Sequence, residues 1–244
     1  MTVATSRIGA LRERHLHASL KAWYAEADDL VETAVDGYVI DLVRGDLLIE
    51  IQTRGFAGMR AKLVALLGRG YRVRVVHPIA VDRWIVQVDG DGTVLGRRRS
   101  PRHEAPADLA AELVSFPELL ADPGFELEVL RTRQEEVRRH DPARCWRRRG
   151  WTVVERRLVE VVDRVTFAVP GDLVALLPPG IPEPFTTADL AAALGRPRRT
   201  GQQLAYCLRH AGVIEPTGQP GRAVAYRRVA RPAPASLEPL PLRR

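Results

Sequence analysis

Residues 37–53, GYVIDLVRGDLLIEIQT, contain two short apolar runs on either side of a Gly-Asp pair. Apolar and β-branched runs that flank such a pair are typical of two antiparallel strands joined by a tight turn. We therefore expect strands over residues 38–43 and 47–52. A third apolar run, over residues 30–35, precedes them. The stretch predicts three consecutive strands, around which the rest of the fold is arranged.

The turn sets the register of this hairpin. If residues 45 and 46 form a two-residue loop, Arg44 pairs with Leu47, and Asp41 lies directly opposite Glu50. Directly opposed side chains have Cβ atoms about 4.5–5.5 Å apart, and like charges there are destabilising unless something neutralises them. A divalent cation would do so, because Mg²⁺ binds one or two carboxylates together with water and phosphate. Such an ion could activate water for attack on a phosphodiester.

The strand alternation places the neighbouring side chains. Gln52 lies on the face of Glu50, roughly 6–7 Å along, whereas Ile49 and Ile51 point into the core. The alternative is that Asp41 and Glu50 are polar residues on a solvated sheet face, separated by a register slip of one residue. The pattern leaves both interpretations open.

Helical spacing flanks the three strands. Apolar residues at positions 16, 20, 23 and 24 predict a first helix, and Glu13, His17 and Lys21 lie four residues apart on a second stripe of it. The elements that we expect next to the hairpin are helices over residues 9–27 and 55–68 and strands over residues 71–79 and 83–88. This order indicates an α/β fold with a mixed sheet.

Lysine is rare in this arginine-rich chain, whose two lysines are Lys21 and Lys62. The lysine ammonium group is compact, and burial can shift its pKa, whereas arginine stays charged. A retained lysine can therefore mark a chemical role. Chance placement of two residues is the alternative.

The second half of the chain predicts a connector and a small C-terminal domain. The connector is expected to be helical over residues 107–140 and to continue into a basic stretch that ends at residue 149. Residues 151–168 fit either a helix or a β-hairpin, and we favour the hairpin. Short helices over residues 172–177, 187–194 and 199–211, then strands over residues 213–215 and 224–229, follow the order of a winged helix-turn-helix. The expected domains are residues 1–105 (α/β), 106–168 (connector), 169–230 (winged helix) and 231–244 (disordered tail).

The third of these short helices has the composition of a DNA-reading helix. In a helix-turn-helix, the N-terminal residues of the second helix of the motif contact base edges in the major groove. Arginine and glutamine side chains are suited to bases, and arginines on the wing are suited to phosphates. The candidate DNA-binding residues are Arg196, Arg198, Arg199, Thr200, Gln202, Gln203, Arg222 and Arg227. A winged helix that binds only protein is the alternative.

The charge of the chain favours a polyanionic partner. The formal net charge is +7 and the pI is near 10.1, almost entirely from arginine, which binds phosphate bidentately. We expect DNA rather than a membrane, because no apolar run is long enough to span one. The first 20 residues lack the apolar core of a secretory signal, so a cytoplasmic location is expected. Cys145 and Cys207 are too few and too far apart to predict a disulfide framework or a zinc site.

The acid on the second strand and the acid-x-polar triplet Glu50-Ile51-Gln52 on the third resemble the motif of the PD-(D/E)XK nuclease superfamily. The resemblance covers about residues 9 to 90. It implies a restriction-endonuclease-like fold in the first domain, Asp41 and Glu50 as ligands of Mg²⁺ or Mn²⁺, and Glu13 as the additional acid of many members. Gln52 stands where most members have lysine, and Lys62 is the available substitute. The stretch 37–53 also resembles an uncharacterised bacterial family that joins this fold to a C-terminal winged helix.

The expected function is therefore a metal-dependent DNA phosphodiesterase, a hydrolase with a catalytic set formed by Glu13, Asp41, Glu50, Gln52 and Lys62. The alternative, favoured by Gln52, is a non-catalytic DNA-binding regulator or adaptor with a degenerate nuclease-like domain. A third possibility is a protein-interaction module that uses residues 107–140. The pattern leaves the DNA structure or sequence preference, a homodimeric state and the biological pathway open.

Overall fold

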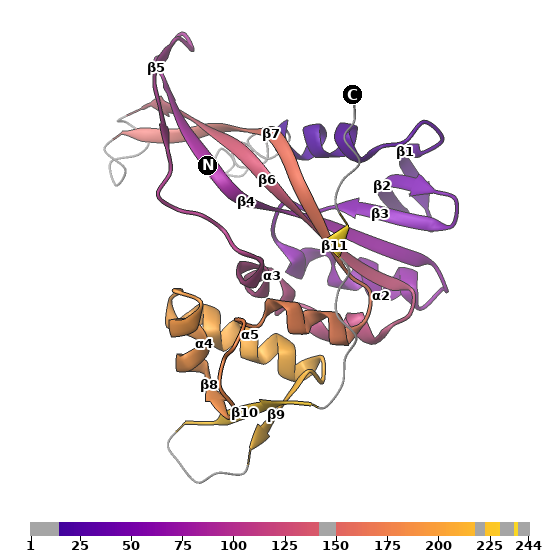
Figure 1. Cartoon of the computed structure of the whole chain (residues 1–244). Helices are drawn as coiled ribbons and strands as arrows, with labels where there is room; N and C mark the ends of the chain where they lie inside the picture. The colour runs from indigo at the N-terminus through magenta and orange to yellow at the C-terminus, as the bar shows by residue number, and fades with distance from the viewer. Residues whose placement is uncertain (1–14, 142–149, 218–222, 230–236, 239–244) are drawn as a thin grey trace, which may run out of the picture.

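A computed structural model describes residues 15–141, 150–217, 223–229 and 237–238 (Figure 1). Residues 15–24 are helical and are called the N-terminal helix below. The other helical segments are η1 (Phe56–Met59), α2 (Arg60–Leu67), η2 (Pro106–Leu109), α3 (Ala110–Leu113), η3 (Pro117–Ala121), η5 (Pro170–Leu176), α4 (Thr187–Ala193) and α5 (Arg198–His210). The strands are β1 (Leu30–Val35), β2 (Tyr38–Arg44), β3 (Leu47–Ile51), β4 (Arg72–Val88), β5 (Val94–Arg99), β6 (Phe125–His140), β7 (Trp151–Phe167), β8 (Phe185–Thr186), β9 (Ile214–Thr217), β10 (Ala225–Arg228) and β11 (Leu237–Glu238).

The protein is mixed α/β, as expected, with one large mixed sheet flanked by helices. Within the described ranges this sheet has the strand order β1-β2-β3-β4-β6-β7-β11, with β5 paired to β4. The β3–β4 and β4–β6 pairs are parallel, whereas β1–β2, β2–β3, β4–β5, β6–β7 and β7–β11 are antiparallel. A second sheet, β8-β10-β9, belongs to the C-terminal segment.

The hairpin of residues 38–51 has the expected register. Arg44 pairs with Leu47, Val43 with Leu48 and Leu42 with Ile49, and the paired region ends there, one residue before Asp41 and Glu50. β3 is buried along its whole length, because it lies between β2 and β4 and has helices on both faces. The turn chemistry therefore predicted this part of the fold correctly.

The two faces of β3 belong to different core clusters. Ile49 and Ile51 pack with Leu16 and Leu20 of the N-terminal helix, as predicted for the inward-pointing isoleucines. Leu48 packs on the other side in the cluster that includes α2. Figure 1 shows the N-terminal helix (indigo) and α2 on opposite sides of the sheet. The acidic hairpin is thus held between two helices.

The prediction of a helix over residues 107–140 was wrong beyond residue 121, and the connector is not helical there. Residues 106–121 contain short helical segments, but Phe125–His140 is the sixteen-residue strand β6. Its buried residues mostly alternate, and a continuous ladder with β4 on one side and β7 on the other satisfies its backbone. Long-range pairing therefore overrides the local helical pattern.

Within the expected segment 151–168, residues 151–167 form one long strand, β7, rather than an internal hairpin or a helix. The two strands expected over residues 71–79 and 83–88 are a single strand, β4, whose register shifts between Ala80 and Asp82. Figure 1 shows β4, β5, β6 and β7 extending together to one side of the helical layers. The segment that was expected to connect two domains is therefore part of the main sheet.

The C-terminal segment contains helices close to their expected positions. α4 begins after Thr186, whose hydroxyl accepts a hydrogen bond from the Asp189 N–H while the Asp189 carboxylate accepts from the Thr186 N–H. The element expected at residues 172–177 is the 3-10 helix η5. The expected turn over residues 218–221 and Arg222 lie outside the described residues.

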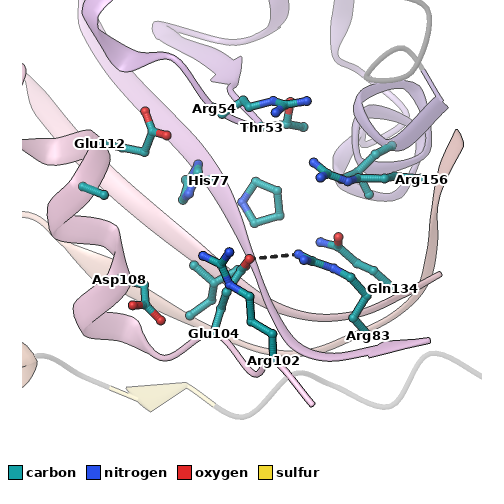
Figure 2. Close-up of a pocket in the computed structure, with 14 residues that line it drawn as sticks. Thr53, Arg54, His77, Arg83, Arg102, Glu104, Asp108, Glu112, Gln134 and Arg156 are labelled. Carbon is teal, nitrogen blue, oxygen red and sulfur yellow. Dashed lines mark hydrogen bonds and ion pairs between the residues drawn. The ribbon is translucent and has the colours of Figure 1, made fainter. Parts of the chain in front are cut away.

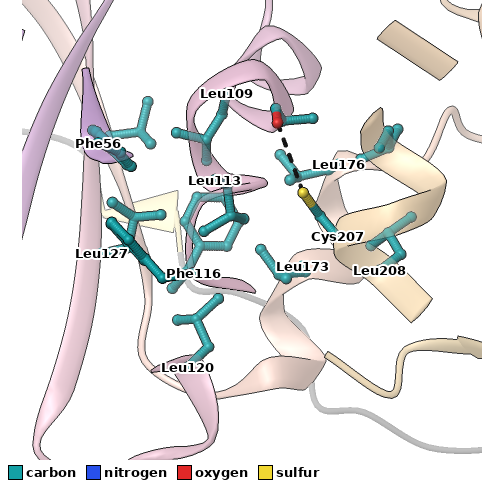
Figure 3. Close-up of a cluster of buried hydrophobic side chains, with 14 of the residues drawn as sticks. Phe56, Leu109, Leu113, Phe116, Leu120, Leu127, Leu173, Leu176, Cys207 and Leu208 are labelled. Atoms are coloured by element: carbon teal, nitrogen blue, oxygen red, sulfur yellow. Dashed lines mark hydrogen bonds between the residues drawn. The ribbon is translucent and has the colours of Figure 1, made fainter. Parts of the chain in front are cut away.

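The C-terminal helices share a hydrophobic core with the main sheet. Leu204 and Leu208 of α5 belong to the same buried cluster as Leu113 of α3 and Phe116. Figure 3 shows this contact, in which the Cys207 Sγ lies 3.7 Å from the Ala110 carbonyl oxygen. The described parts of the two segments are therefore packed as one body.

The close crossing of α4 and α5 depends on Gly201. A Cβ at this position would lie 2.9 Å from the Ala191 nitrogen and closer still to the Thr187 carbonyl oxygen. Alanine normally favours a helix over glycine, but here overpacking dominates, so we expect Gly201→Ala to lower the free energy of unfolding by about 1–3 kcal/mol. Urea denaturation measures this change. Gly58→Ala is the control, since a Cβ at Gly58 meets nothing within 4 Å; equal stability of both variants would contradict the prediction.

The expected disordered tail is only partly described. Leu237 and Glu238 form β11, which pairs with Val165 and Arg164 of β7, so the prediction of disorder was wrong for these two residues. The backbone pairing with β7 accounts for the strand at these two residues, although the surrounding sequence is rich in proline. Residues 231–236 and 239–244 lie outside the described residues.

Every helix in the part of the chain that the structure describes is too short or too polar to cross a bilayer.

Candidate active site

The acidic pair, Asp41 and Glu50, lies where β2 and β3 separate. The backbone pairs between the strands run from Arg44 to Leu42, and the next N–H of β3, that of Ile51, donates to the Asp41 side chain (N to Oδ2, 2.9 Å). The carboxylate thus takes over a hydrogen bond that the strand ladder would otherwise make. This bond fixes Asp41 at the end of β3.

The N-terminal helix supplies basic side chains to Asp41. His17 Nε2 lies 3.1 Å from Asp41 Oδ2, and Lys21 Nζ lies 4.0 Å from Oδ1. Burial alone would raise the pKa of Asp41, but His17, the Ile51 N–H and Lys21 outweigh it, so the pKa is lowered. Lys21 also pairs with Glu32 on β1. Two residues of the expected stripe, His17 and Lys21, therefore face Asp41. The third, Glu13, lies outside the described residues.

Lys62 on α2 reaches Glu50. Its Nζ donates to Glu50 Oε1 at 2.5 Å and to the Val39 carbonyl oxygen at 2.6 Å. Both side chains are largely buried, with 17% and 11% of their surfaces exposed. Burial raises the pKa of Glu50 against the opposing effect of Lys62, and the nearby charge of Asp41 raises it further. The two acids therefore have pKa values shifted in opposite directions.

This difference predicts a distinct pH dependence. A carboxyl group with a raised pKa stabilises the fold most below its unfolded-state value of 4.5 and loses that contribution as the pH rises through its folded-state pKa. We expect the free energy of unfolding of the wild type to fall relative to Glu50→Gln as the pH rises above 4.5 and through the higher folded-state pKa. Denaturant unfolding at several pH values measures this difference. A difference that does not change with pH would contradict the raised pKa.

Gln52 makes its described side-chain hydrogen bonds to the turn after β3. Its Nε2 donates to the Arg54 carbonyl oxygen at 2.5 Å and lies 3.5 Å from that of Gly55. The structure therefore brings Lys62 to Glu50, whereas the amide of Gln52 holds the turn.

His17 is a site residue that the sequence reasoning placed on the helix stripe without giving it a role. The signal was its spacing of four residues from Glu13 and Lys21, which puts the three side chains on one side of a helix. Among the described residues, no group of three or more His, Cys, Asp and Glu side chains is arranged to hold a metal ion. Asp41 and Glu50 are the available oxygen ligands.

A cavity of about 290 Å³ lies beside the end of β3. Its walls come from the N-terminal helix, the turn after β3, the middle of β4, the segment around η2 and α3, and strands β6 and β7. Figure 2 shows its polar lining, which includes both arginine and carboxylate side chains. Leu16 lines this cavity, and the next residue, His17, contacts Asp41. The cavity and the acidic pair therefore lie on neighbouring sides of the β3 end.

The candidate DNA-binding residues differ in their surroundings. Arg198, Arg199, Gln202 and Arg227 are exposed, and Thr200 and Gln203 are half-buried. Arg199, Gln202, Gln203 and Tyr206 line an open depression of about 390 Å³ together with Val114. The outer face of α5 is thus accessible next to α3.

Arg196, another of the candidate DNA-binding residues, makes contacts within the protein. Its Nη2 donates to Asp108 Oδ2 and to the His103 carbonyl oxygen, both at 2.8 Å. These bonds tie the start of α5 to the segment that borders the cavity. Arg227, on β10, pairs with Glu215 at 2.7 Å.

Comparison with known proteins gives a match over the main sheet. Residues 14–168 match the model of a family described as "Domain of unknown function (DUF8091)". An uncharacterized protein of Treponema pallidum (strain Nichols) is 28% identical over 225 residues, which cover 91% of this chain and 87% of that protein. No solved structure matches the chain. The family match spans the acidic pair, Lys62 and every residue that lines the cavity.

Proposed function

Since the chain belongs to this family of unknown function, DUF8091, we propose its activity from the site: a metal-dependent phosphodiesterase of the PD-(D/E)XK type that cleaves DNA. The main sheet would be the restriction-endonuclease-like domain, and residues 185–228 the core of a winged helix that binds the substrate. The proposal rests on the arrangement around Asp41 and Glu50.

One observation carries the proposal: both lysines of the chain reach the acidic pair. Lys62 contacts Glu50, and Lys21 lies 4.0 Å from Asp41. Arginine replaces lysine everywhere else in the sequence, so the retained lysines coincide with the two acids. Lysine offers a compact, movable ammonium group that a purely structural ion pair with carboxylate does not require. This coincidence is what a chemical role predicts.

The side chains present fit Mg²⁺ or Mn²⁺. Asp41 and Glu50 would be the protein ligands, because hard cations prefer carboxylate oxygens and often bind through only one or two of them. When bound, the ion would polarise the phosphodiester and lower the pKa of a water molecule. The Ile51 N–H holds Asp41 in place for this role, and the raised pKa of Glu50 makes its availability as a ligand dependent on pH.

Lys62 takes the role that lysine has in most members of the superfamily. An ammonium group has three N–H donors, and two of those of Lys62 are directed to Glu50 and the Val39 carbonyl. The third is available for a phosphate oxygen or for the water that attacks it. A positive charge held there stabilises the negative charge that develops on the phosphate in the transition state. Gln52, directed at the turn, is not required for this step.

The outer face of α5 supports DNA as the substrate. Its exposed Arg198, Arg199 and Gln202 suit contacts with phosphates and base edges. We expect Arg199→Gln to weaken DNA binding about tenfold or more, because a base or phosphate contact would be lost. Fluorescence anisotropy at fixed salt measures this affinity. Arg209→Gln, at the opposite end of α5, is the control and should bind like the wild type; an equal loss in both variants would indicate a general charge effect.

A non-catalytic DNA-binding regulator or adaptor is the second candidate. It is favoured by the basic side chains that already contact both acids, His17 at Asp41 and Lys62 at Glu50. Neither carboxylate therefore requires a cation to neutralise its charge. This candidate predicts DNA binding that is unaffected by Mg²⁺ and no cleavage.

The two candidates are separated by incubating the purified chain with duplex, branched and single-stranded DNA in Mg²⁺, in Mn²⁺ or in a chelator. The proposed function predicts cleavage of at least one substrate that the chelator abolishes. Intact DNA under every condition, with binding retained, would establish the second candidate instead.

A further inference from the structure

The cavity beside the end of β3 has no role in the reaction described above. It is bordered by Thr53 and Arg54, which directly follow β3, and by Leu16, which precedes the Asp41 contact His17. A substrate bound at the acidic pair would reach this cavity by extending past the end of β3. The chemistry of its lining defines that group.

The carboxylates in the cavity wall are already occupied. Glu104 accepts from the Ala80 N–H at 2.8 Å and from Arg83 at 2.9 Å. Glu112 accepts from the backbone N–H groups of Gly55 and Phe56. The third, Asp108, accepts from the Ala105 N–H and from Arg196, each at 2.8 Å. These acids therefore serve the protein, and little acceptor capacity faces a ligand.

The arginines of the wall have unused donors. Arg83 uses its Nη2 for Glu104 at 2.9 Å, and Arg156 uses its Nη2 for Glu136 at 3.3 Å, so the described contacts occupy only part of each guanidinium group. Arg102 is exposed at the rim of the cavity, and its positive charge lowers the pKa of Glu104. Figure 2 shows Arg83 and Arg102 beside Glu104, and Arg156 further along the lining. Guanidinium N–H groups without an acceptor would gain charge-assisted hydrogen bonds from an anion in the cavity.

We propose that this cavity binds a terminal phosphate monoester of the DNA strand that enters the acidic site, with Arg102 and Arg156 as its main contacts. This proposal rests on the proposed function. A monoester carries a charge of about −1.5 to −2 at neutral pH, which matches several guanidinium groups better than a diester does. The small volume, walled by both helical layers and by β4, β6 and β7, suits the end of a strand rather than a duplex backbone passing through.

The test is binding of a single-stranded oligonucleotide, labelled on an internal base, whose ends carry 5′-phosphate, 3′-phosphate or only hydroxyl groups. Fluorescence anisotropy is measured with a chelator present, so that cleavage cannot occur. We expect one phosphorylated form to bind about tenfold more tightly than the hydroxyl form. Arg102→Gln and Arg156→Gln should abolish this preference while leaving the affinity for the hydroxyl form unchanged. Arg157→Gln is the control, because Arg157 is a neighbour on β7 that pairs with Glu155 outside the cavity.

Equal binding of all three forms would overturn the proposal, as would a preference that survives in both cavity variants. Competition by inorganic phosphate or a mononucleotide, without any preference among the strands, would assign the cavity to a free phosphate ligand and would also overturn it. Failure here is distinguishable from failure of the proposed function, which is decided by metal-dependent cleavage of a hydroxyl-ended strand. Thermal unfolding of each variant shows whether it is folded.

Discussion

Asp41→Asn is expected to lower the rate of metal-dependent DNA cleavage by about 10³-fold or more. The substitution keeps the size of the side chain and its acceptor for the Ile51 N–H, but removes the negative charge of one ligand. Charge stabilisation by a bound ion contributes several kcal/mol to such reactions, and each factor of ten in rate corresponds to about 1.4 kcal/mol. The rate is measured on the preferred substrate in Mg²⁺ and in Mn²⁺.

Asp46→Asn is the matched control for this experiment. Asp46 lies in the turn of the same hairpin, is 73% exposed and contacts Arg72 across the surface. Its substitution removes the same charge at a site remote from Glu50, so cleavage should stay near the wild-type rate. Equal rates for Asp41→Asn and the wild type would show that any cleavage arises elsewhere in the chain.

Lys62→Ala is expected to reduce cleavage about 100-fold or more while retaining DNA binding. Loss of one fixed donor to a transition-state charge has an effect of about this size. The variant also leaves Glu50 buried without its basic partner, which raises the pKa of Glu50 further and weakens its use as a ligand. Single-turnover cleavage separates this effect from substrate binding.

Arg60→Ala provides the comparison for Lys62→Ala. Arg60 lies on the same helix and forms an ion pair with Glu118 in which both side chains are about half exposed. This pair contributes about 1 kcal/mol or less to stability and nothing to the site. If both variants cleave equally well, Lys62 has a structural role alone.

Much of the acidic site could be predicted because its determinants are local. The Gly-Asp turn predicted the pairing of Arg44 with Leu47, and the observed pairs run from there to Leu42 and Ile49, the residues next to Asp41 and Glu50. The rarity of lysine directed attention to Lys62, and the four-residue spacing on the first helix put His17 and Lys21 on one side.

The remaining features depend on contacts between distant segments. The hydrogen bonds of the Gln52 amide to the Arg54 and Gly55 carbonyls were not predicted, because they depend on the turn that follows β3 and not on the strand pattern. β6 was taken for a helix because its ladder with β4 and β7 joins residues far apart in the sequence. Arg196 was assigned to DNA because no local pattern indicates that Asp108 holds it.

The most direct test of the central claim moves the lysine between the two positions. The claim is that Lys62 replaces the lysine that most members of the superfamily have where this chain has Gln52. The measurement is the rate of Mg²⁺-dependent DNA cleavage by the wild type, Lys62→Ala, and the double variant Lys62→Ala with Gln52→Lys. We predict that the double variant cleaves at least about tenfold faster than Lys62→Ala, because a lysine side chain is longer than glutamine and its ammonium group can extend from position 52 toward the same acids. Cleavage by Lys62→Ala at the wild-type rate, or no cleavage by the wild type on any DNA substrate, would contradict the claim.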